Sequence, residues 1–400
     1  MAAETRVGSR FEDALHRGVG DIVLNRLTNI SIETVAYEKK SKGDDMNLYV
    51  HIPFCTEICS FCAFHRRVGN SRQQESYTTA LETHIDDVLA PFGQDQKIPS
   101  ILVGGGTPGL LSAGQADRII SRVRGAVNAR NSQITYELHP ENISEEYIKD
   151  LEGIGVGRFS VGIQTLSNDE RKILGRDLTS AEDDIASLQI MNQLGVTYNV
   201  DLMFGTPAQT QRSWLDTLQR INAQVRPPEL TIYQYVNAYG STTRKWIAEG
   251  IVSRPDFRTR KAMYSQAVDT LKVSGYRQTS TYSFSRDIST TNRALLNQGS
   301  DFFGLGPRTY SRIGRNLFIN GARTSDFVTG GNMADYFGLR VPFPVMTVLD
   351  RTFGLFARGS RNTEGKTGTI GSLQSEAVAQ VYGILYYITN QPKLSRKEAR

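Results

Sequence analysis

The sequence predicts an α/β fold in which a partial barrel of six parallel strands, surrounded by helices, is followed by a smaller α+β domain. From about residue 46 onward, short β-rich runs alternate with longer amphipathic stretches, a pattern typical of parallel βαβ units. The chain has 400 residues and 39% apolar content, enough to bury one barrel-sized core and a smaller one. After Tyr235 the alternation stops, and this change indicates the second domain.

Six runs rich in apolar and β-branched residues predict the barrel strands. Between them, apolar residues recur at helical spacing and predict the surrounding helices. The predicted strands cover Asn47–Ile52, Ser100–Val103, Gln133–Leu138, Arg158–Ile163, Tyr198–Phe204 and Glu229–Tyr235, and predicted helices include Tyr77–Leu89, Ala113–Val127 and Ala181–Leu194.

These patterns divide the chain into three regions. Residues 1–45 are predicted to form a helical lead-in, residues 46–240 the barrel, and residues 241–400 the C-terminal domain. In the last region we expect a helix over Arg258–Val273, strand character over Gly275–Phe284 and a helix over Glu376–Ile388.

Composition and charge argue against two classes of partner. The net charge of +5 is small and spread over both halves of the chain, so it does not indicate nucleic acid. The first residues lack an apolar signal core, and the longest apolar run, Val378–Ile388, is too short to span a bilayer. We therefore expect a cytoplasmic protein that acts on a small molecule, without a nucleic-acid or membrane partner. A reducing compartment also suits its free thiols.

The chain contains three cysteines, Cys55, Cys59 and Cys62, all on one short loop. Three thiolates do not complete a four-coordinate structural zinc site by themselves. Because iron-sulfur clusters are normally held by four cysteines, three cysteines leave one iron open to a substrate or cofactor. We therefore expect a 4Fe–4S cluster here. A zinc site completed by His51 or His65 is the alternative.

Unusual polar residues and glycines stand at the carboxyl ends of the predicted strands, where parallel β/α folds build their active sites. The cysteine loop follows the first strand, and Gly104–Pro108 follows the second. Glu137 and Gln164 end the third and fourth strands, Asp201 interrupts the apolar fifth, and Tyr235–Val236 end the sixth. We expect these six elements to meet at one mouth.

Two further features allow more than one interpretation. Gly104–Gly109 satisfies the dinucleotide-binding pattern G-x-G-x-x-G, but Pro108 lies inside it and no acidic residue follows about twenty positions on. Glycines here instead let the backbone approach a bound ligand closely. The aromatic-rich segments Tyr233–Tyr239 and Tyr276–Phe284 have side chains that suit a flat substrate and equally suit ordinary barrel wall and core.

The segment Leu48–Phe54, followed by a Cys-x3-Cys-x2-Cys loop, resembles the radical S-adenosylmethionine (SAM) superfamily and, within it, the HemN-like branch. The resemblance runs from about Asn47 to about Gly314. It implies a partial (β/α)6 radical SAM barrel and a C-terminal domain that covers the substrate. It further implies a 4Fe–4S cluster, two SAM molecules and a flavodoxin- or ferredoxin-type electron donor.

The resemblance also implies roles for individual residues. Cys55, Cys59 and Cys62 would bind the cluster, whose free iron would chelate the amino and carboxylate groups of the first SAM. Tyr49 and Asp201 are the expected catalytic residues. The first SAM would contact Tyr49, Gly105, Glu137 and Val236, and the second would contact Phe61, Gly106, Thr107, Gln164, Arg176 and Asp201, with Tyr310 a looser match on the same side.

Three departures from the branch's patterns narrow the expected activity. The dehydrogenases of this branch carry a further cysteine where this chain has Phe64. The heme chaperones carry a His-Asn-x-x-Tyr-Trp motif where this chain has Thr291–Asn297 without histidine. All five histidines lie at or before position 139, so the C-terminal region has no imidazole for a heme.

These departures make the class C methyltransferases and cyclopropanases the nearest match. We therefore expect an enzyme of specialised metabolism that methylates or cyclopropanates an sp2 carbon of a small aromatic or heteroaromatic substrate. A radical made from the first SAM would take hydrogen from the methyl group of the second. The alternatives are tetrapyrrole chemistry, by coproporphyrinogen III decarboxylation or heme opening, and a heme-binding or chaperone protein.

Overall fold

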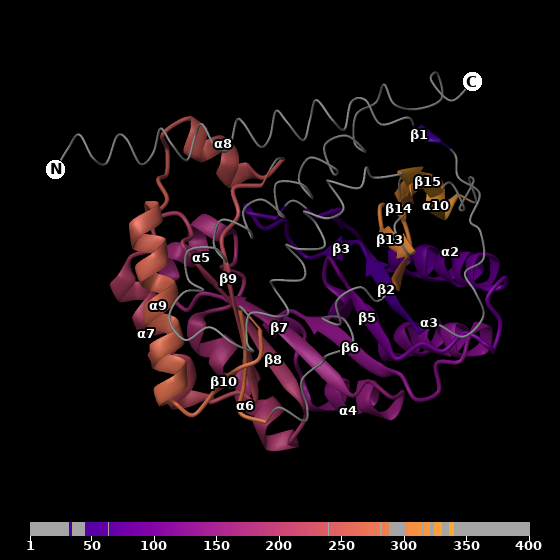
Figure 1. The fold of residues 1–400 in the computed structure, drawn as a ribbon, viewed down its shortest axis with the longest axis horizontal. Helices are drawn as coiled ribbons and strands as arrows, with labels where there is room; N and C mark the ends of the chain where they lie inside the picture. The colour runs from indigo at the N-terminus through magenta and orange to yellow at the C-terminus, as the bar shows by residue number, and fades with distance from the viewer. Residues whose placement is uncertain are drawn as a thin grey trace.

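Six parallel strands form the centre of the fold in the computed structural model (Figure 1). Each pairs in parallel with the next along the chain, which confirms the predicted strands with ends that differ by at most two residues. The strands are β2 (Met46–Ile52), β5 (Ser100–Gly105), β6 (Gln133–Leu138), β7 (Arg158–Gln164), β8 (Tyr198–Phe204) and β9 (Glu229–Gln234).

The structure describes part of the chain. The described residues are 32–33, 45–62, 64–238, 240–280, 282–287, 301–313, 316–320, 324–329 and 336–339. The predicted helix over 376–388, the segment 291–297 and most of the predicted lead-in therefore lie outside them.

Helices connect the parallel strands and lie along the outer side of the sheet (Figure 1). Local sequence sets where several begin, because capping boxes satisfy backbone N–H groups of the first turn. Asn70 with Gln73 and Ser112 with Gln115 are two such pairs. The helices are α2 (Ser71–Leu89), α3 (Ala113–Ala126), α4 (Glu145–Gly153), α5 (Asn168–Leu174), α6 (Ala181–Leu194) and α7 (Gln211–Gln224).

The sheet continues beyond the six strands at both edges. β12 (Asp301–Leu305) pairs in parallel with β2, and β11 (Ser283–Ser285) pairs antiparallel with β9. Beyond them lie β13 (Tyr310–Ile313), β14 (Asn316–Asn320), β15 (Tyr336–Leu339), β1 (Ile32–Glu33) and β10 (Arg277–Gln278), with the short β3 (Phe54–Cys55) and β4 (Arg67–Val68) paired apart from this sheet.

Two observations bear on the predicted division of the chain, which stays a prediction. Described strands after residue 240 pair directly with β2 and β9, so the sheet has no break at that boundary. The described residues of the lead-in, Ile32–Glu33, are a strand rather than a helix. The predicted helix near 258–273 is present as α9 (Phe257–Val273), together with α8 (Thr242–Ala248) and α10 (Thr324–Val328).

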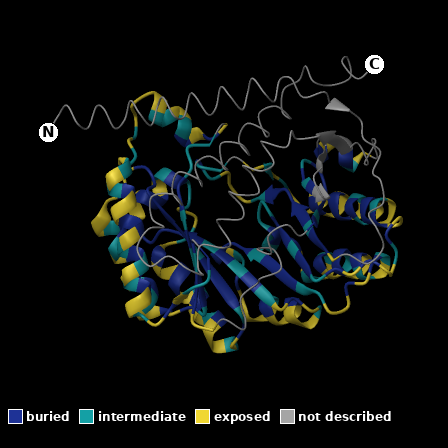
Figure 2. Cartoon of the chain, in the orientation of Figure 1, coloured by how far each residue is buried: buried dark blue, intermediate teal, exposed yellow. Residues whose placement is uncertain are grey.

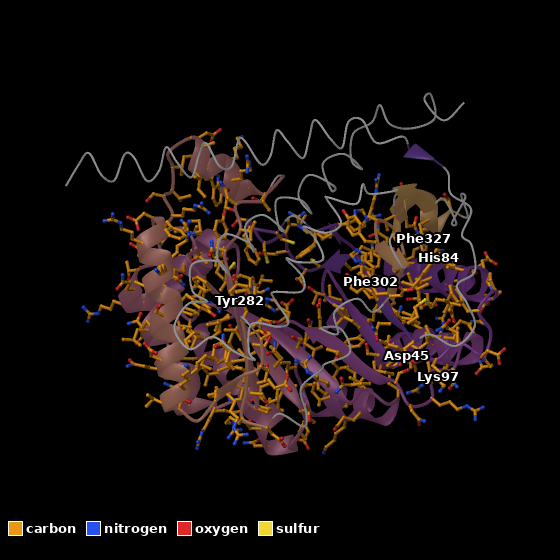
Figure 3. All side chains as sticks on the ribbon, viewed as in Figure 1. Asp45, His84, Lys97, Tyr282, Phe302 and Phe327 are labelled. Atoms are coloured by element: carbon orange, nitrogen blue, oxygen red, sulfur yellow. The ribbon has the colours of Figure 1, made fainter. Side chains whose placement is uncertain are left out.

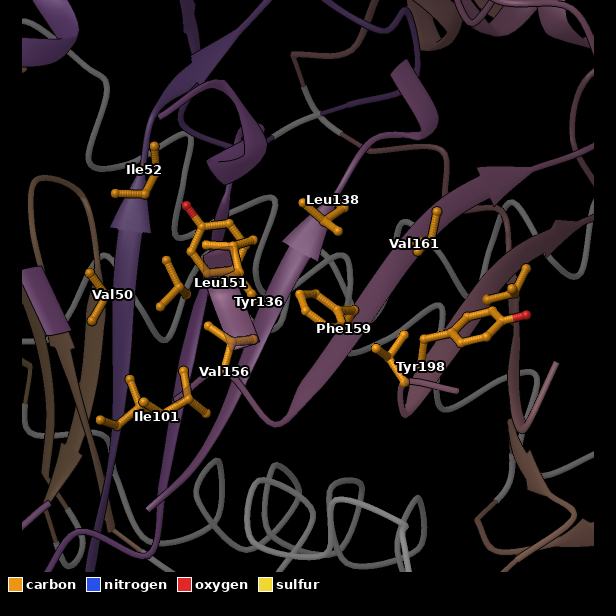
Figure 4. Packing of buried hydrophobic residues seen from close by; sticks show 14 of the residues in the cluster. Val50, Ile52, Ile101, Tyr136, Leu138, Leu151, Val156, Phe159, Val161 and Tyr198 are labelled. Atoms are coloured by element: carbon orange, nitrogen blue, oxygen red, sulfur yellow. The ribbon is translucent and has the colours of Figure 1, made fainter. Parts of the chain in front are cut away.

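Apolar side chains of the strands and of the inner helix faces form the core. Buried residues fill the sheet, whereas exposed residues cover the outer helix surfaces (Figure 2). Tyr136, Phe159 and Tyr198, from three neighbouring strands, are fully buried in this layer (Figure 4). At the other edge, Phe327 of α10 packs on His84 of α2 with ring centroids 5.1 Å apart (Figure 3).

Within the described part of the chain, every helix is too short or too polar to cross a lipid bilayer.

A buried ion pair joins α5 to α6. Arg171 of α5 donates to the carboxylate of Asp184 of α6, and both side chains are 2% exposed. Thr179 adds hydrogen bonds to both partners. Because both charges are buried, each requires the other for compensation.

We predict that Asp184→Ala lowers the free energy of unfolding by about 3–5 kcal/mol, because it leaves the Arg171 charge buried without its partner. Urea denaturation of the cofactor-free protein measures this change. Glu145→Ala, which removes one partner of an exposed Lys149 pair, is the control and should unfold with the wild-type midpoint. Equal midpoints for all three proteins would contradict the prediction.

Candidate active site

One open cleft lies at the carboxyl ends of the parallel strands. Its free space, counted out to open solvent, is about 1000 Å³. All three cysteines line it. So do the predicted residues Phe61, Gly105, Gly106, Thr107, Glu137, Gln164, Arg176 and Asp201, which come from five strand ends and the loops after them.

The cysteine loop is pinned from two sides. Thr56 donates to a carboxylate oxygen of Glu141 at 2.7 Å, beyond the end of β6. On the other side, the Ser60 N–H donates to Leu174 O at 3.0 Å, at the end of α5. The three cysteines between and beside these contacts are free thiols and partly exposed. The loop therefore presents its thiols to the cleft from a fixed backbone.

Burial keeps two of these thiols protonated in the cofactor-free protein. It raises the pKa of Cys55 to about 11, and it also raises the pKa of Cys62. Metal ions bind the thiolate form, so loading the site releases protons.

The donor set fits an iron-sulfur cluster better than a single zinc ion. Among the described residues, no three His, Cys, Asp or Glu side chains group closely enough to hold one ion. A cluster instead takes one thiolate on each of several irons. Both nitrogens of His51 are already hydrogen bonded, to the Tyr49 hydroxyl and to His65 O, each at 2.9 Å. His65 in turn bonds Thr324 through Nε2 at 2.7 Å, so a zinc ion at His51 or at this nitrogen would have to replace an existing hydrogen bond.

The glycine turn after β5 lies directly against the cysteine segment. The Gly106 N–H donates to Ile52 O at 2.7 Å, and the Thr107 N–H donates to Phe54 O at 2.6 Å. A Cβ atom at Gly106 would lie 2.4 Å from Phe54 O. Gly105 has φ +119°, a region that favours glycine, and its Cβ would lie 2.5 Å from the His51 ring. These two positions therefore require glycine.

Two half-buried carboxyl groups form the floor of the cleft. Glu137 accepts the Gly105 N–H at 3.1 Å, and burial raises the pKa of Glu137 to about 7. Asp201 accepts hydrogen bonds from Ser160 at 2.9 Å and Asn199 at 2.8 Å, while burial raises its pKa. Each carboxyl group can therefore change protonation when a cationic or hydrogen-bonding ligand arrives.

The opposite wall combines an amide, a phenol and a guanidinium. Tyr233 of β9 donates to the side-chain oxygen of Gln164, whose φ of +70° is unusual for a residue other than glycine. Arg176 donates to Gly162 O, and its Nη1 lies 3.8 Å from the Cys59 sulfur. This wall therefore places donors and acceptors for carboxylate and hydroxyl groups beside the cysteine loop.

Three predicted site residues do not line the cleft. Tyr49 is directed at His51, beneath the glycine turn. Val236 is half-buried in the segment after β9. Tyr310 begins β13 and pairs with Ile319 of β14. Their predicted contacts with SAM stay predictions.

The structure adds lining residues that sequence reasoning missed or left open. Of the aromatic segment after residue 232, Tyr233 lines the cleft, whereas Tyr235 is fully buried core. Ser160 stands opposite Glu137 in the parallel register, and its polarity inside an apolar strand was an available signal. His139 and Arg66 also line the cleft, but they lie on loops whose course no local pattern indicates.

Comparison with known proteins finds a superfamily match over the part of the chain that contains most of this cleft. Residues 49–221 match the model of the radical SAM superfamily. The oxygen-independent coproporphyrinogen III oxidase of Salmonella typhimurium is 32% identical over 195 residues, 48% of this chain and 42% of the relative. The heme chaperone HemW of Bacillus subtilis is 25% identical over 279 residues, 68% of this chain and 72% of the relative.

Among solved structures, coproporphyrinogen III oxidase (HemN) from Escherichia coli shares the fold, with a TM-score of 0.65 and 24% identity over 81% of this chain and 77% of that chain. The chain spans 60–64% of the length of its relatives from Danio rerio and Mus musculus. Both relatives are named as mitochondrial proteins, so the predicted cytoplasmic location of this chain stays a prediction. Residues 49–221 are therefore similar to radical SAM domains, which use a 4Fe–4S cluster and SAM, and the chain shares the fold of HemN.

Proposed function

We propose that this radical SAM enzyme binds its cluster through Cys55, Cys59 and Cys62, cleaves SAM in the cleft and acts on a tetrapyrrole. One observation carries the proposal: the three thiols and the polar ends of the parallel strands line a single cleft. The substrate class rests on relatives whose names contain coproporphyrinogen and heme. A flavodoxin- or ferredoxin-type protein would deliver the electron.

When bound, the cluster and SAM supply a 5′-deoxyadenosyl radical that removes a hydrogen atom from a carbon of the substrate. The chain's own residues hold and shield the reactants. Glu137 and the Gly105 backbone are suited to the amino group of the first SAM, because a buried carboxylate accepts its N–H groups. Gly106 lets the turn after β5 pack closely on the Phe54 backbone, beside the cysteine loop.

A second SAM fits the other half of the cleft. Arg176 offers a forked donor for its carboxylate, and Asp201 and Gln164 offer acceptors for ribose hydroxyls or an ammonium group. Support comes from the position of all three residues on the lining of the cleft.

Methylation or cyclopropanation of an sp2 carbon is the second candidate. The sequence alone favours it, but several relatives have heme or coproporphyrinogen in their names, so it ranks below tetrapyrrole chemistry. One observation still supports it. Phe64, which replaces the further cysteine of the dehydrogenases, lines the cleft with 69% of its surface exposed, where it offers an apolar face to an aromatic substrate.

An anaerobic assay of the reconstituted protein with SAM and dithionite separates these functions. We expect 5′-deoxyadenosine to form when coproporphyrinogen III or hemin is added, with little S-adenosylhomocysteine. Formation of 5′-deoxyadenosine and S-adenosylhomocysteine in equal amounts with an aromatic acceptor would favour methyl transfer. Hemin binding without SAM consumption would favour a heme carrier. Cys59→Ala is the control, since it should lack the brown cluster absorbance and form no product.

We predict that SAM binding to the reconstituted protein strengthens as pH rises through about 7. Burial places the Glu137 pKa near 7 in the ligand-free protein, so the accepting carboxylate is the minor form at pH 6 and the main form at pH 8. Affinity should therefore rise about tenfold between these values. Equilibrium dialysis measures it. Glu137→Gln should bind more weakly with a flatter profile, and an unchanged pH profile in this variant would rule out the assignment.

Asp201→Asn tests the second SAM position. The asparagine side chain has the same shape and keeps one oxygen that can accept hydrogen bonds, but it lacks the negative charge and the second acceptor oxygen of the carboxylate. If methyl transfer takes place, the rate of S-adenosylhomocysteine formation should fall at least tenfold, which corresponds to a loss of about 1.4 kcal/mol in transition-state stabilisation. The rate of 5′-deoxyadenosine formation should fall less. Parallel loss of both products would argue against a separate site.

A further inference from the structure

The end of α5 and the cysteine loop are tied together by consecutive residues. Ser60 donates through its N–H to Leu174 O at 3.0 Å and through its hydroxyl to Ile173 O at 2.6 Å. Gly175 then ends α5 in the left-handed conformation, φ +63°. A Cβ there would lie 3.4 Å from Ser60 N, so the two backbones are in close contact. This contact brings the next residue, Arg176, against the loop.

Arg176 is held at both ends. Its backbone N–H donates to Arg171 O at 2.9 Å, and its guanidinium donates to Gly162 O at the end of β7. In this position Nη1 lies 3.8 Å from the sulfur of Cys59. The guanidinium is therefore a fixed positive donor to one predicted cluster ligand.

The cysteine loop is equally fixed on the side of α8. The Thr243 N–H donates to Ser60 O at 3.0 Å, and the Tyr235 hydroxyl donates to the Thr243 hydroxyl at 2.9 Å. Ser60 thus has partners on two separate elements. Cys59, next to it, has little freedom to move away from Arg176.

We propose that Arg176 tunes the reduction potential of the cluster by donating a hydrogen bond to the Cys59 thiolate. Reduction adds one electron to the cluster and makes the cluster with its thiolates more negative by one charge, without breaking a bond. A donor and a positive charge at a ligand sulfur stabilise the more negative form. Arg176 therefore raises the potential and eases reduction. This inference rests on the proposed cluster at Cys55, Cys59 and Cys62.

The same residue has a second role under the proposed function, binding the carboxylate of a second SAM. The two roles are separable, because the sulfur contact exists in the ligand-free protein and needs no SAM. Measurements on the cluster alone therefore report the sulfur contact.

The test is a redox titration of the reconstituted protein with dithionite as reductant, without SAM, followed by the EPR signal of the reduced cluster. In Arg176→Gln, reduction should become about tenfold less favourable, which corresponds to 59 mV for a one-electron couple. Arg176→Lys keeps the charge but loses the planar donor, and its shift should be smaller. Lys172→Gln removes an equal charge from the exposed face of α5 and should keep the wild-type potential.

Several outcomes would overturn the inference. These are a wild-type potential in Arg176→Gln, an equal shift in Lys172→Gln, or failure of both Arg176 variants to hold a cluster, since a tuning contact is not needed for assembly. Failure of the wild-type protein itself to take up a cluster would instead contradict the proposed function. A normal wild-type cluster with no shift in Arg176→Gln would contradict this inference alone.

Discussion

The hydrogen bonds between the cysteine segment and the glycine turn are the constraint on which the site depends. Gly106 and Thr107 donate to carbonyls of Ile52 and Phe54, and no side chain fits between the two backbones. This contact holds the cysteine segment against the turn that leads to the floor of the cleft, where Glu137 and Asp201 are half-buried. The raised pKa values of these two carboxyl groups show that their charged forms are poorly solvated in the ligand-free protein. A bound cationic or hydrogen-bonding ligand would stabilise the charged forms.

Much of the fold was predictable because its signals are local. Buried parallel strands are nearly continuous apolar runs, so β2 and β8 were recognisable from sequence alone. Sites form at the carboxyl ends of such strands, and this rule was sufficient to predict that Glu137, Gln164 and Asp201 lie together. The residue roles themselves rested on the resemblance.

What sequence did not reveal depends on long-range contacts or on rotamers. The pairing of β12 with β2 joins distant parts of the chain, and no local pattern marks it. Tyr49 has the polarity of a site residue, but its hydroxyl is engaged by His51. The 3.8 Å approach of Arg176 to Cys59 depends on where α5 ends. The absence of a chaperone histidine motif pointed toward methylation, whereas relatives that match 48–68% of the chain have coproporphyrinogen or heme in their names.

The pairing of β12 with β2 also determines the order in which this protein can mature. β2 leads into the cysteine loop, and its outer edge has no strand partner until residues 301–305 have left the ribosome. An unpaired edge of this kind is open to incorrect pairing during synthesis. The Thr324 contact to His65 and the Phe327 contact to His84 form later still. The sheet edge beside the cysteine loop is therefore completed only after residues 301–305 have been synthesised.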